Sequence, residues 1–276
     1  MDELVEAVRR ALREDRASED VTTRLLGASA DRPAVARLVA EQRFVVAGLP
    51  VAGAVFRELD PDVQFTDSAE GAWADPGDVI AVVRGRAGAI LSAERVALNF
   101  LQRLSAIATA TRRAAQAVAG TSARITHTRK TTPGLRALEQ YAVRVGGGVD
   151  NRASLAEAIL WKDNHWALLA RNGHSLAEAL RAAASGTPVI VEVESDAQLE
   201  EALAAGVTHL LVDNQSPERV VAWVKRAGPG ITIQASGGIT LENARAYAEA
   251  GASLIAIGAL THSVMAVPIT CEIVED

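Results

Sequence analysis

The sequence predicts an α/β protein in which a small N-terminal α+β domain precedes a βα barrel, complete or incomplete. Two observations predict this fold class. From residue 123 onward, short apolar strands alternate with helices in five or six successive units, and this spacing is typical of a parallel sheet. Before that point lie an amphipathic helix, several short strand-like runs and a long helix. A flat, doubly wound sheet is the competing arrangement for the second half.

The N-terminal part contains recognisable but irregular elements. Apolar residues recur at helical spacing over residues 3–14, which predicts a helix. Residues 34–83 are strand-like, with breaks expected at Gly48 and Pro50. A strand over residues 78–83 is expected to end at a turn, and a long helix is expected from Ser92.

The second half is more regular. The predicted strands, with the one at 155–162 entered from a helix, cover residues 123–128, 155–162, 188–194, 209–213, 231–236 and 253–259. The predicted helices cover residues 135–143, 176–185, 199–206, 217–228 and 241–251. The sequence contains neither GxGxxG nor GxxxxGK(S/T), so those two modes of nucleotide binding have no support.

Composition limits the class of protein. The chain has 276 residues, of which 49% are hydrophobic, enough for one large core or two modest ones. A net charge of −6 argues against a nucleic-acid-binding face. No apolar run reaches the roughly 18 residues of a membrane span, and the N-terminus lacks the apolar centre of a signal peptide. The single cysteine, Cys271, excludes an intrachain disulfide. We therefore expect a cytoplasmic protein that binds neither nucleic acid nor membranes.

Polar residues follow the predicted strands, where βα barrels carry their active sites. Lys162 and Asp213 end two strands, and Glu192 and Glu194 end the strand between them. Strand alternation separates the valines of that strand from its two carboxylates, which therefore point into the barrel. A buried carboxylate requires a cation or a substrate donor. An internal ion pair between Glu192 and Lys162 is the structural alternative, and Glu194, nearer the rim, is interpreted as the structural member of the two acids.

A cationic cluster suits a ligand with several negative charges. Arg129 and Lys130 end one strand, and Arg152 follows the run of glycines at 146–148. Arginine binds carboxylates and phosphates with two parallel hydrogen bonds. The glycines would allow close approach to a ligand or another chain, or form a flexible turn. A solvated surface is the alternative interpretation of the arginines.

The segment Ser236-Gly237-Gly238 can present backbone N–H groups beside a helix N-terminus, which favours a phosphate site. Gly258 ends the next strand, with His262 four residues further on. Together the strand ends predict one phosphate seat, two or three acids and several cations. A sugar phosphate that carries pyrophosphate, meeting a small polycarboxylate, would use all of them, with Mg²⁺ held by few carboxylates and the substrate phosphates.

Several segments then resemble one family, the quinolinate phosphoribosyltransferases. The most specific is TRKTTPGLRALEQYAVRVGGG at 128–148. The others, in chain order, are DVTT at 20–23, ERVALNFLQRLSAIAT at 94–109, KDNH at 162–165, VEVE at 191–194, LVDN at 211–214, ASGGIT at 235–240 and IGALTHS at 257–263. The resemblance extends over nearly the whole chain.

The resemblance implies an incomplete βα barrel and an N-terminal α+β domain. The implied domains are residues 1–108, residues 109–264 and a C-terminal segment, 265–276, that returns to the N-terminal domain. It implies transfer of a phosphoribosyl group from phosphoribosyl pyrophosphate to quinolinate with decarboxylation, giving nicotinate mononucleotide for NAD synthesis. It also implies Mg²⁺ as cofactor and a homodimer or higher homo-oligomer with shared active sites.

The site roles implied by the resemblance fall into three groups. Arg129, Arg152 and Lys162 would bind the quinolinate carboxylates, Lys130 quinolinate or pyrophosphate, and Arg103 would come from the partner subunit; Thr128 and Asn151 also belong to the substrate site. Glu192 and Asp213 would be the acids on the ribose and Mg²⁺ side, with no protein ligand to the metal assigned directly. The 5′-phosphate seat would comprise Ser236, Gly237, Gly238, Ile257, Gly258, Ala259 and His262. We count Lys130, Lys162, Glu192 and Asp213 as the catalytic set.

Three positions depart from the family pattern. His127 and Gln234 stand where the family usually has acids, and Asn151 stands where it usually has a histidine that contacts substrate. Asparagine can donate a hydrogen bond but carries no charge. The alternatives are therefore a paralogous phosphoribosyltransferase for another aromatic acid, and a non-catalytic phosphosugar-binding barrel. Retention of Lys162, Glu192 and Asp213 argues against the second.

Overall fold

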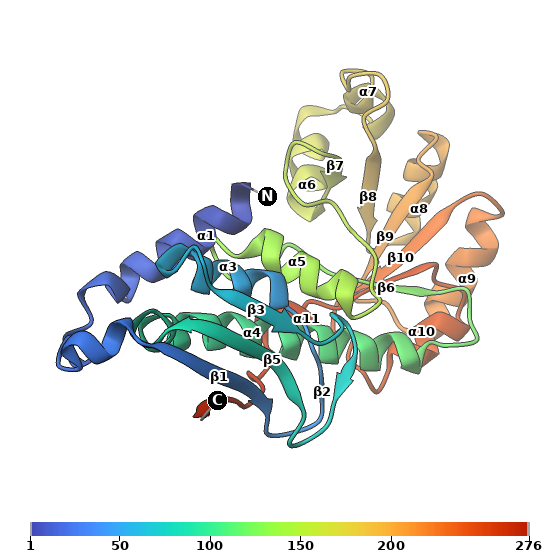
Figure 1. The fold of residues 1–276 in the computed structure, drawn as a ribbon. Coiled ribbons are helices and arrows are strands. Elements are labelled where there is room, and N and C mark those ends of the chain that lie inside the picture. Colours follow the sequence, from blue (N-terminus) through green and yellow to red (C-terminus); the bar gives the residue numbers. More distant parts are fainter. Residues whose placement is uncertain (1, 275–276) are drawn as a thin grey trace. The chain divides into compact units, whose positions relative to one another are not determined.

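The computed structural model describes residues 2–274, which form two compact units (Figure 1). The N-terminal unit comprises the chain up to Arg112, Thr131–Gly147 and the chain from Leu260 onward. The barrel unit comprises Arg113–Lys130 and Gly148–Ala259. These bounds differ from the expected ranges chiefly in segment 131–147, which was expected in the barrel domain. It belongs to the N-terminal unit because its helix contributes Leu138, Ala142 and Val143 to that unit's hydrophobic core.

The N-terminal unit is built on a four-stranded antiparallel sheet in the order β12-β1-β5-β3. Its strands are β1 (Pro33–Ala40), β3 (Gln64–Asp67), β5 (Val79–Arg86) and β12 (Ile269–Val274), and a small second sheet pairs β2 (Phe44–Val45) with β4 (Trp73–Ala74). The helices that lie wholly or mainly in this unit are α1 (Asp2–Glu14), α2 (Val21–Arg24), α3 (Leu49–Leu59), α4 (Ala87–Ala117), α5 (Arg136–Val145) and α11 (Ala259–His262), with short 3-10 turns at Ala17–Glu19 and Gly27–Asp31. The C-terminal strand β12 thus pairs with β1.

Two expectations for this unit were wrong. Residues 34–83 were expected to be strand-like with breaks at Gly48 and Pro50, but after Gly48 the chain forms helix α3. Gly48 has φ +100°, and a proline in the first helical turn loses no hydrogen bond because that N–H has no partner in the helix. The Glu70 carboxylate accepts hydrogen bonds from the N–H groups of Gly48 and Leu49 at 2.6 and 3.1 Å, which caps the helix. The turn expected after residue 83 is also absent, because β5 continues to Arg86 and α4 follows directly.

The barrel unit contains six parallel strands in the order β6-β11-β10-β9-β8-β7 (Figure 1). The strands are β6 (Arg124–Thr126), β7 (Ile159–Trp161), β8 (Val189–Val193), β9 (His209–Asp213), β10 (Thr232–Ser236) and β11 (Leu254–Ala256). The strands from β7 to β11 follow one another in chain order, and the last pairs with β6. A doubly wound sheet would reverse its order at a switch point. The sheet is therefore a barrel, left open between β6 and β7 in the described residues.

The connecting helices match the expected alternation except near β7. They are α6 (Asp163–Asn172), α7 (Leu176–Leu180), α8 (Asp196–Ala204), α9 (Pro217–Ala227) and α10 (Ala244–Glu249). The expected helix before β7 is wrong, since residues 155–157 form only a turn. Helix α6, which directly follows Lys162, was not predicted. Over residues 2–274 the structure has no helix that combines the length and hydropathy needed to cross a membrane.

Candidate active site

A pocket of about 320 Å³ lies within the barrel unit. Alternation along the strands aims every second residue at it: Ile190 and Glu192 from β8, Leu211 and Asp213 from β9. The complete lining is Thr128, Arg129, Lys130, Asn151, Arg152, Leu160, Lys162, Ile190, Glu192, Leu211, Asp213, Gln234, Ser236 and Ala256. All four residues of the predicted catalytic set therefore face one cavity, as do five of the predicted substrate-binding residues (Thr128, Arg129, Asn151, Arg152 and Ser236).

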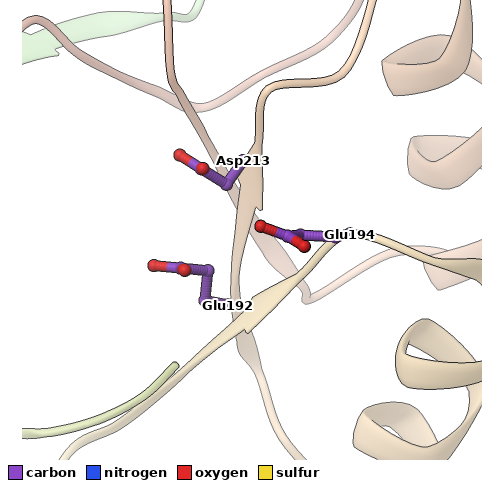
Figure 2. Close-up of side chains that lie close together, drawn as sticks. All are labelled: Glu192, Glu194 and Asp213. Carbon is purple, nitrogen blue, oxygen red and sulfur yellow. The ribbon is translucent and has the colours of Figure 1, made fainter. Parts of the chain in front are cut away.

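The acids gather at the ends of β8 and β9. Figure 2 shows Glu192 and Asp213 projecting from these two strands, with Glu194 just beyond the end of β8. One carboxylate oxygen of each lies within 4.8 Å of the other two. Glu192 is buried, and burial raises the pKa of its carboxyl group; Lys162 opposes that rise, whereas Asp213 and Asp163 add to it. A nearby cation, or a ligand hydroxyl that donates a hydrogen bond, would stabilise the charged form of this buried carboxylate.

Lys162 and Glu192 form the ion pair that the structural alternative expected. The Lys162 Nζ lies 3.0 Å from the Glu192 Oε2. The lysine side chain is 46% exposed, however, and it lines the pocket. The pair thus stands in the pocket wall rather than inside a closed core, so Lys162 remains accessible to a ligand.

Arg129 and Arg152 face the same pocket, close enough for their positive charges to repel each other. Burial lowers the pKa of Arg152, and the positive charge of Arg129 lowers it further. The Arg152 Nη1 donates to the carbonyl of Ala158 at 3.2 Å. The Nε of Arg129 is buried and has no hydrogen-bond partner among residues 2–274. A buried donor without an acceptor is costly, and an anionic ligand would relieve both this cost and the repulsion between the guanidinium groups.

The loop that carries Arg152 is fixed by Asn151 and His127. Val149 runs beside β6, donating its N–H to the Ile125 carbonyl at 2.8 Å. The Asn151 Nδ2 donates to the His127 carbonyl at 3.0 Å, and its Oδ1 accepts from the Arg152 N–H at 2.8 Å. The Asn151 N–H in turn donates to the fully buried His127 Nε2 at 3.2 Å. Both ends of the Asn151 amide are thus bonded to backbone, which holds Arg152 in place.

The predicted phosphate seat is present in part. Ser236 lines the pocket, and Gly237 and Gly238 have φ +84° and +58°. A Cβ on Gly237 would lie 2.2 Å from the Asn214 Oδ1, so only glycine fits there. The expectation of a helix N-terminus beside these glycines is wrong. Residues 239–243 intervene before α10, because the Asn243 side chain binds the Gly238 carbonyl and the Thr240 N–H instead. After β11, the Ile257 N–H donates to the Thr126 carbonyl at 3.1 Å, ahead of Gly258 and Ala259.

The remaining predicted site residues, Arg103 and His262, belong to the N-terminal unit. The Arg103 guanidinium binds the buried Glu139 carboxylate through Nε and Nη2 at 3.1 and 2.8 Å. It also donates to the Thr132 hydroxyl at 3.2 Å and to the Thr261 carbonyl, one residue before His262. Its predicted role in a partner's active site stays a prediction. The glycine run has a packing role here, since a Cβ on Gly146 would lie 2.5 Å from the Ala108 carbonyl oxygen of α4.

Sequence reasoning missed the floor of the pocket. Gln234 was noted only as a departure from the family pattern. The Gln234 Oε1 lies 2.9 Å from the His209 Nε2, and Gln234 itself lines the pocket. Counting back two residues from Ser236 and from Asp213 gives Gln234 and Leu211, and alternation would therefore have found both.

An open βα barrel whose strand ends combine clustered cations, paired acids and a glycine turn has the features of an anion-binding barrel with its site at the carboxyl ends of the strands. The quinolinate phosphoribosyl transferase family models match this chain at residues 20–105 for the N-terminal domain and 107–272 for the C-terminal domain. The chain belongs to this family, as its motifs indicated.

Individual relatives support the same family assignment. The chain is 41% identical over 266 residues, 94% of its length and 93% of the relative's, to a nicotinate-nucleotide pyrophosphorylase (carboxylating) of Mycobacterium leprae. It is 41% identical over 239 residues, 86% of its length and 83% of the relative's, to a probable enzyme of the same name from Bacillus subtilis. The crystal structure of NadC from Streptococcus pyogenes superposes with a TM-score of 0.90 at 35% identity, covering 98% of this chain and 96% of that one. The incomplete-barrel prediction is thereby confirmed.

Proposed function

We propose that this chain transfers the phosphoribosyl group of phosphoribosyl pyrophosphate to quinolinate and releases carbon dioxide and pyrophosphate, forming nicotinate mononucleotide for NAD synthesis. Family membership supports the reaction. The observation that carries the site assignment is the juxtaposition, in one pocket, of Arg129, Arg152 and Lys162 with the acids Glu192 and Asp213. The buried, unpartnered Nε of Arg129 supports an anionic ligand in particular.

In the proposed mechanism the protein chiefly positions two anions. The pyridine nitrogen forms a bond to C1 of the ribose as the bond from C1 to the pyrophosphate oxygen breaks, and the electron pair leaves with pyrophosphate. The carboxylate carbon next to the nitrogen then leaves as carbon dioxide, the ring carbon keeps the electron pair, and a proton from water replaces the carboxylate. Lys162, Arg129 and Arg152 would hold the two carboxylates so that the nitrogen faces C1, which makes the first step effectively intramolecular.

The acids would act on the sugar side. In the proposed complex, Glu192 and Asp213 accept hydrogen bonds from the ribose hydroxyls and oppose positive charge developing at C1. The donor set of Glu192, Glu194 and Asp213 fits a divalent cation, because hard cations such as Mg²⁺ prefer a few carboxylates together with substrate phosphates. When bound, Mg²⁺ would neutralise the leaving pyrophosphate. Ser236 and the glycines after it would contact the 5′-phosphate.

Two further parts of the proposal concern the whole protein. We expect a cytoplasmic enzyme, as the lone cysteine also suggests. We also expect a homodimer or higher homo-oligomer in which Arg103 contributes to the partner's site. Sedimentation equilibrium of the full chain tests the assembly, and a monomer at micromolar concentration with full activity would contradict it.

The decisive test of the reaction is mass detection of nicotinate mononucleotide from quinolinate, phosphoribosyl pyrophosphate and Mg²⁺. A parallel reaction with nicotinate in place of quinolinate is expected to give no product, because it presents only one carboxylate to the cation cluster. Product from another aromatic acid alone would identify a paralogous transferase. Binding of phosphoribosyl pyrophosphate without any turnover would identify a non-catalytic barrel.

A further inference from the structure

The pocket floor holds one polar side chain that the mechanism above does not use. Gln234 is 1% exposed and lies at the middle of β10, on the same strand face as Ser236. Its register partners are Leu211 on β9 and Leu254 on β11. A fully buried amide in apolar surroundings is expected to have its hydrogen bonds satisfied.

One end of this amide is satisfied by His209. His209 begins β9 and shares its pocket-directed face with Leu211 and Asp213. Burial lowers the pKa of its imidazole, against a smaller opposing effect of the bond to Gln234, so the ring is neutral near pH 7. The Gln234 Oε1 can only accept, so the His209 Nε2 must carry the proton and donate across their 2.9 Å separation.

This bond fixes which end of the amide faces the ligand. With Oε1 engaged by His209, the Nε2 group is the remaining polar end of a side chain that lines the pocket. Among residues 2–274, the side-chain hydrogen bond of Gln234 is the one to His209, and it does not involve that Nε2. Gln234 therefore presents two donor hydrogens at the floor, where a glutamate would present an acceptor.

The neighbours of Gln234 indicate which substrate it meets. Asp213 and Ser236 are its pocket-lining neighbours on β9 and β10, in the middle of the sheet. The cations Arg129 and Lys162 instead follow β6 and β7, the two edge strands of the open barrel. The donor thus lies on the ribose-phosphate side of the pocket and away from the carboxylate-binding side.

We propose that Gln234 is a binding residue that donates its side-chain amide to an acceptor oxygen on the ribose-5-phosphate half of phosphoribosyl pyrophosphate. His209 is the positioning residue that orients the amide. The inference deepens the proposed function and rests on it for the identity of the ligand. The proposal predicts that substitutions at Gln234 change KM for phosphoribosyl pyrophosphate and leave KM for quinolinate unchanged, because the quinolinate contacts lie on other strands.

The test compares substitutions at both positions by steady-state kinetics with each substrate varied in turn. Gln234→Met keeps the approximate size but removes the donor, and it is expected to raise KM for phosphoribosyl pyrophosphate about three- to tenfold. Gln234→Leu is expected to raise the same constant about three- to tenfold. In both variants KM for quinolinate should stay within about twofold of the native value.

The positioning role has its own variants. His209→Leu should raise KM for phosphoribosyl pyrophosphate several-fold with kcat nearly unchanged, and His209→Gln, which keeps a donor, should restore it. Combining His209→Leu with Gln234→Leu should add nothing to Gln234→Leu alone, since both act through one amide. Thr232→Val is the matched control, because Thr232 is the register partner of His209 and should alter neither constant.

Equal increases in both Michaelis constants, or none in folded Gln234→Leu, would overturn the proposal. Additive effects in the double variant would remove the positioning role of His209. Calorimetric titration with phosphoribosyl pyrophosphate alone separates this inference from the reaction. If the native chain makes no nicotinate mononucleotide but the Gln234→Leu variant binds phosphoribosyl pyrophosphate more weakly than the native chain does, the reaction fails and the Gln234 contact stands.

Discussion

Replacing Lys162 with alanine tests the carboxylate-binding cluster most sharply. The lysine side chain is 46% exposed and pairs with Glu192 at 3.0 Å. An ion pair whose lysine is half exposed and screened by solvent contributes no more than about 1 kcal/mol to folding, so Lys162→Ala should remain folded. In the substrate complex the lysine instead makes a charge-assisted hydrogen bond to a carboxylate, with a contribution of about 1.5–3 kcal/mol.

That contribution converts to a fall in kcat/KM for quinolinate of about tenfold to about 150-fold. The decrease is expected near the upper end, because Glu192 would also lose its cation and the pKa of its carboxyl group would rise further. The assay is initial-rate formation of nicotinate mononucleotide at saturating phosphoribosyl pyrophosphate, with thermal unfolding as the check on folding.

Two controls accompany this measurement. Lys162→Arg retains the positive charge and should recover part of the lost activity, though not all, because the guanidinium differs in shape. Lys225→Ala removes an exposed lysine of α9 and should change nothing. Folded Lys162→Ala with kcat/KM within threefold of the native value would refute the assignment of the cluster.

Four other predictions follow from the structure. Arg103→Ala should lower the free energy of unfolding by about 3 kcal/mol, because it leaves the buried Glu139 carboxylate without its cation; chemical denaturation checks this, and a loss below about 1 kcal/mol would contradict it. If Arg103 also serves a partner's site, a folded Arg103→Lys variant mixed with Lys162→Ala should regain activity through hybrid sites, whereas no recovery despite proven subunit exchange would assign each site to one chain. Asn151→Ala should raise KM for quinolinate about three- to tenfold and spare phosphoribosyl pyrophosphate, because it frees the loop that carries the neighbouring arginine; equal effects on both substrates would argue against this. Glu192→Gln should abolish turnover yet raise the melting temperature by about 2 °C at pH 7. Because the pKa of Glu192 is raised, the folded protein binds the proton more tightly than the unfolded chain, and the stability of the native protein falls as pH rises from the ordinary glutamate pKa through the raised one. The rise in melting temperature of Glu192→Gln should therefore vanish below about pH 4, where the native carboxyl group is protonated in both states. A rise that persists at that pH would contradict the prediction.

Much of the barrel site follows from strand alternation. Glu192 was predicted because alternation along its strand places it on the face opposite the valines, and Asp213 was predicted because it ends the next strand. The structure also revises how one predicted residue works. Asn151 lines the pocket, but its amide is bonded to the backbone of His127 and Arg152. No local sequence pattern predicts this contact, because it forms only where Val149 pairs with Thr126 of β6, a residue distant in the sequence.

Other errors arise from contacts between residues that lie far apart in the sequence. Helix α3 was missed because Gly48 and Pro50 are strand breakers in one setting and helix-starting residues in another, and the difference lies in the distant cap Glu70. The pairing of His209 with Gln234 was missed because the two residues lie on different strands. Neither residue ends its strand, whereas Asp213 does. Contacts between strands depend on register, which the sequence pattern alone does not specify.

The central claim is that the cation cluster and the acids join quinolinate to phosphoribosyl pyrophosphate with loss of one particular carboxylate. Quinolinate labelled with carbon-13 in the carboxylate next to the ring nitrogen tests it directly, in a reaction that quantifies nicotinate mononucleotide, pyrophosphate and labelled carbon dioxide together. We predict equal amounts of all three, and no label in the nucleotide. Label retained in the nucleotide, or pyrophosphate released without nucleotide, would contradict the claim.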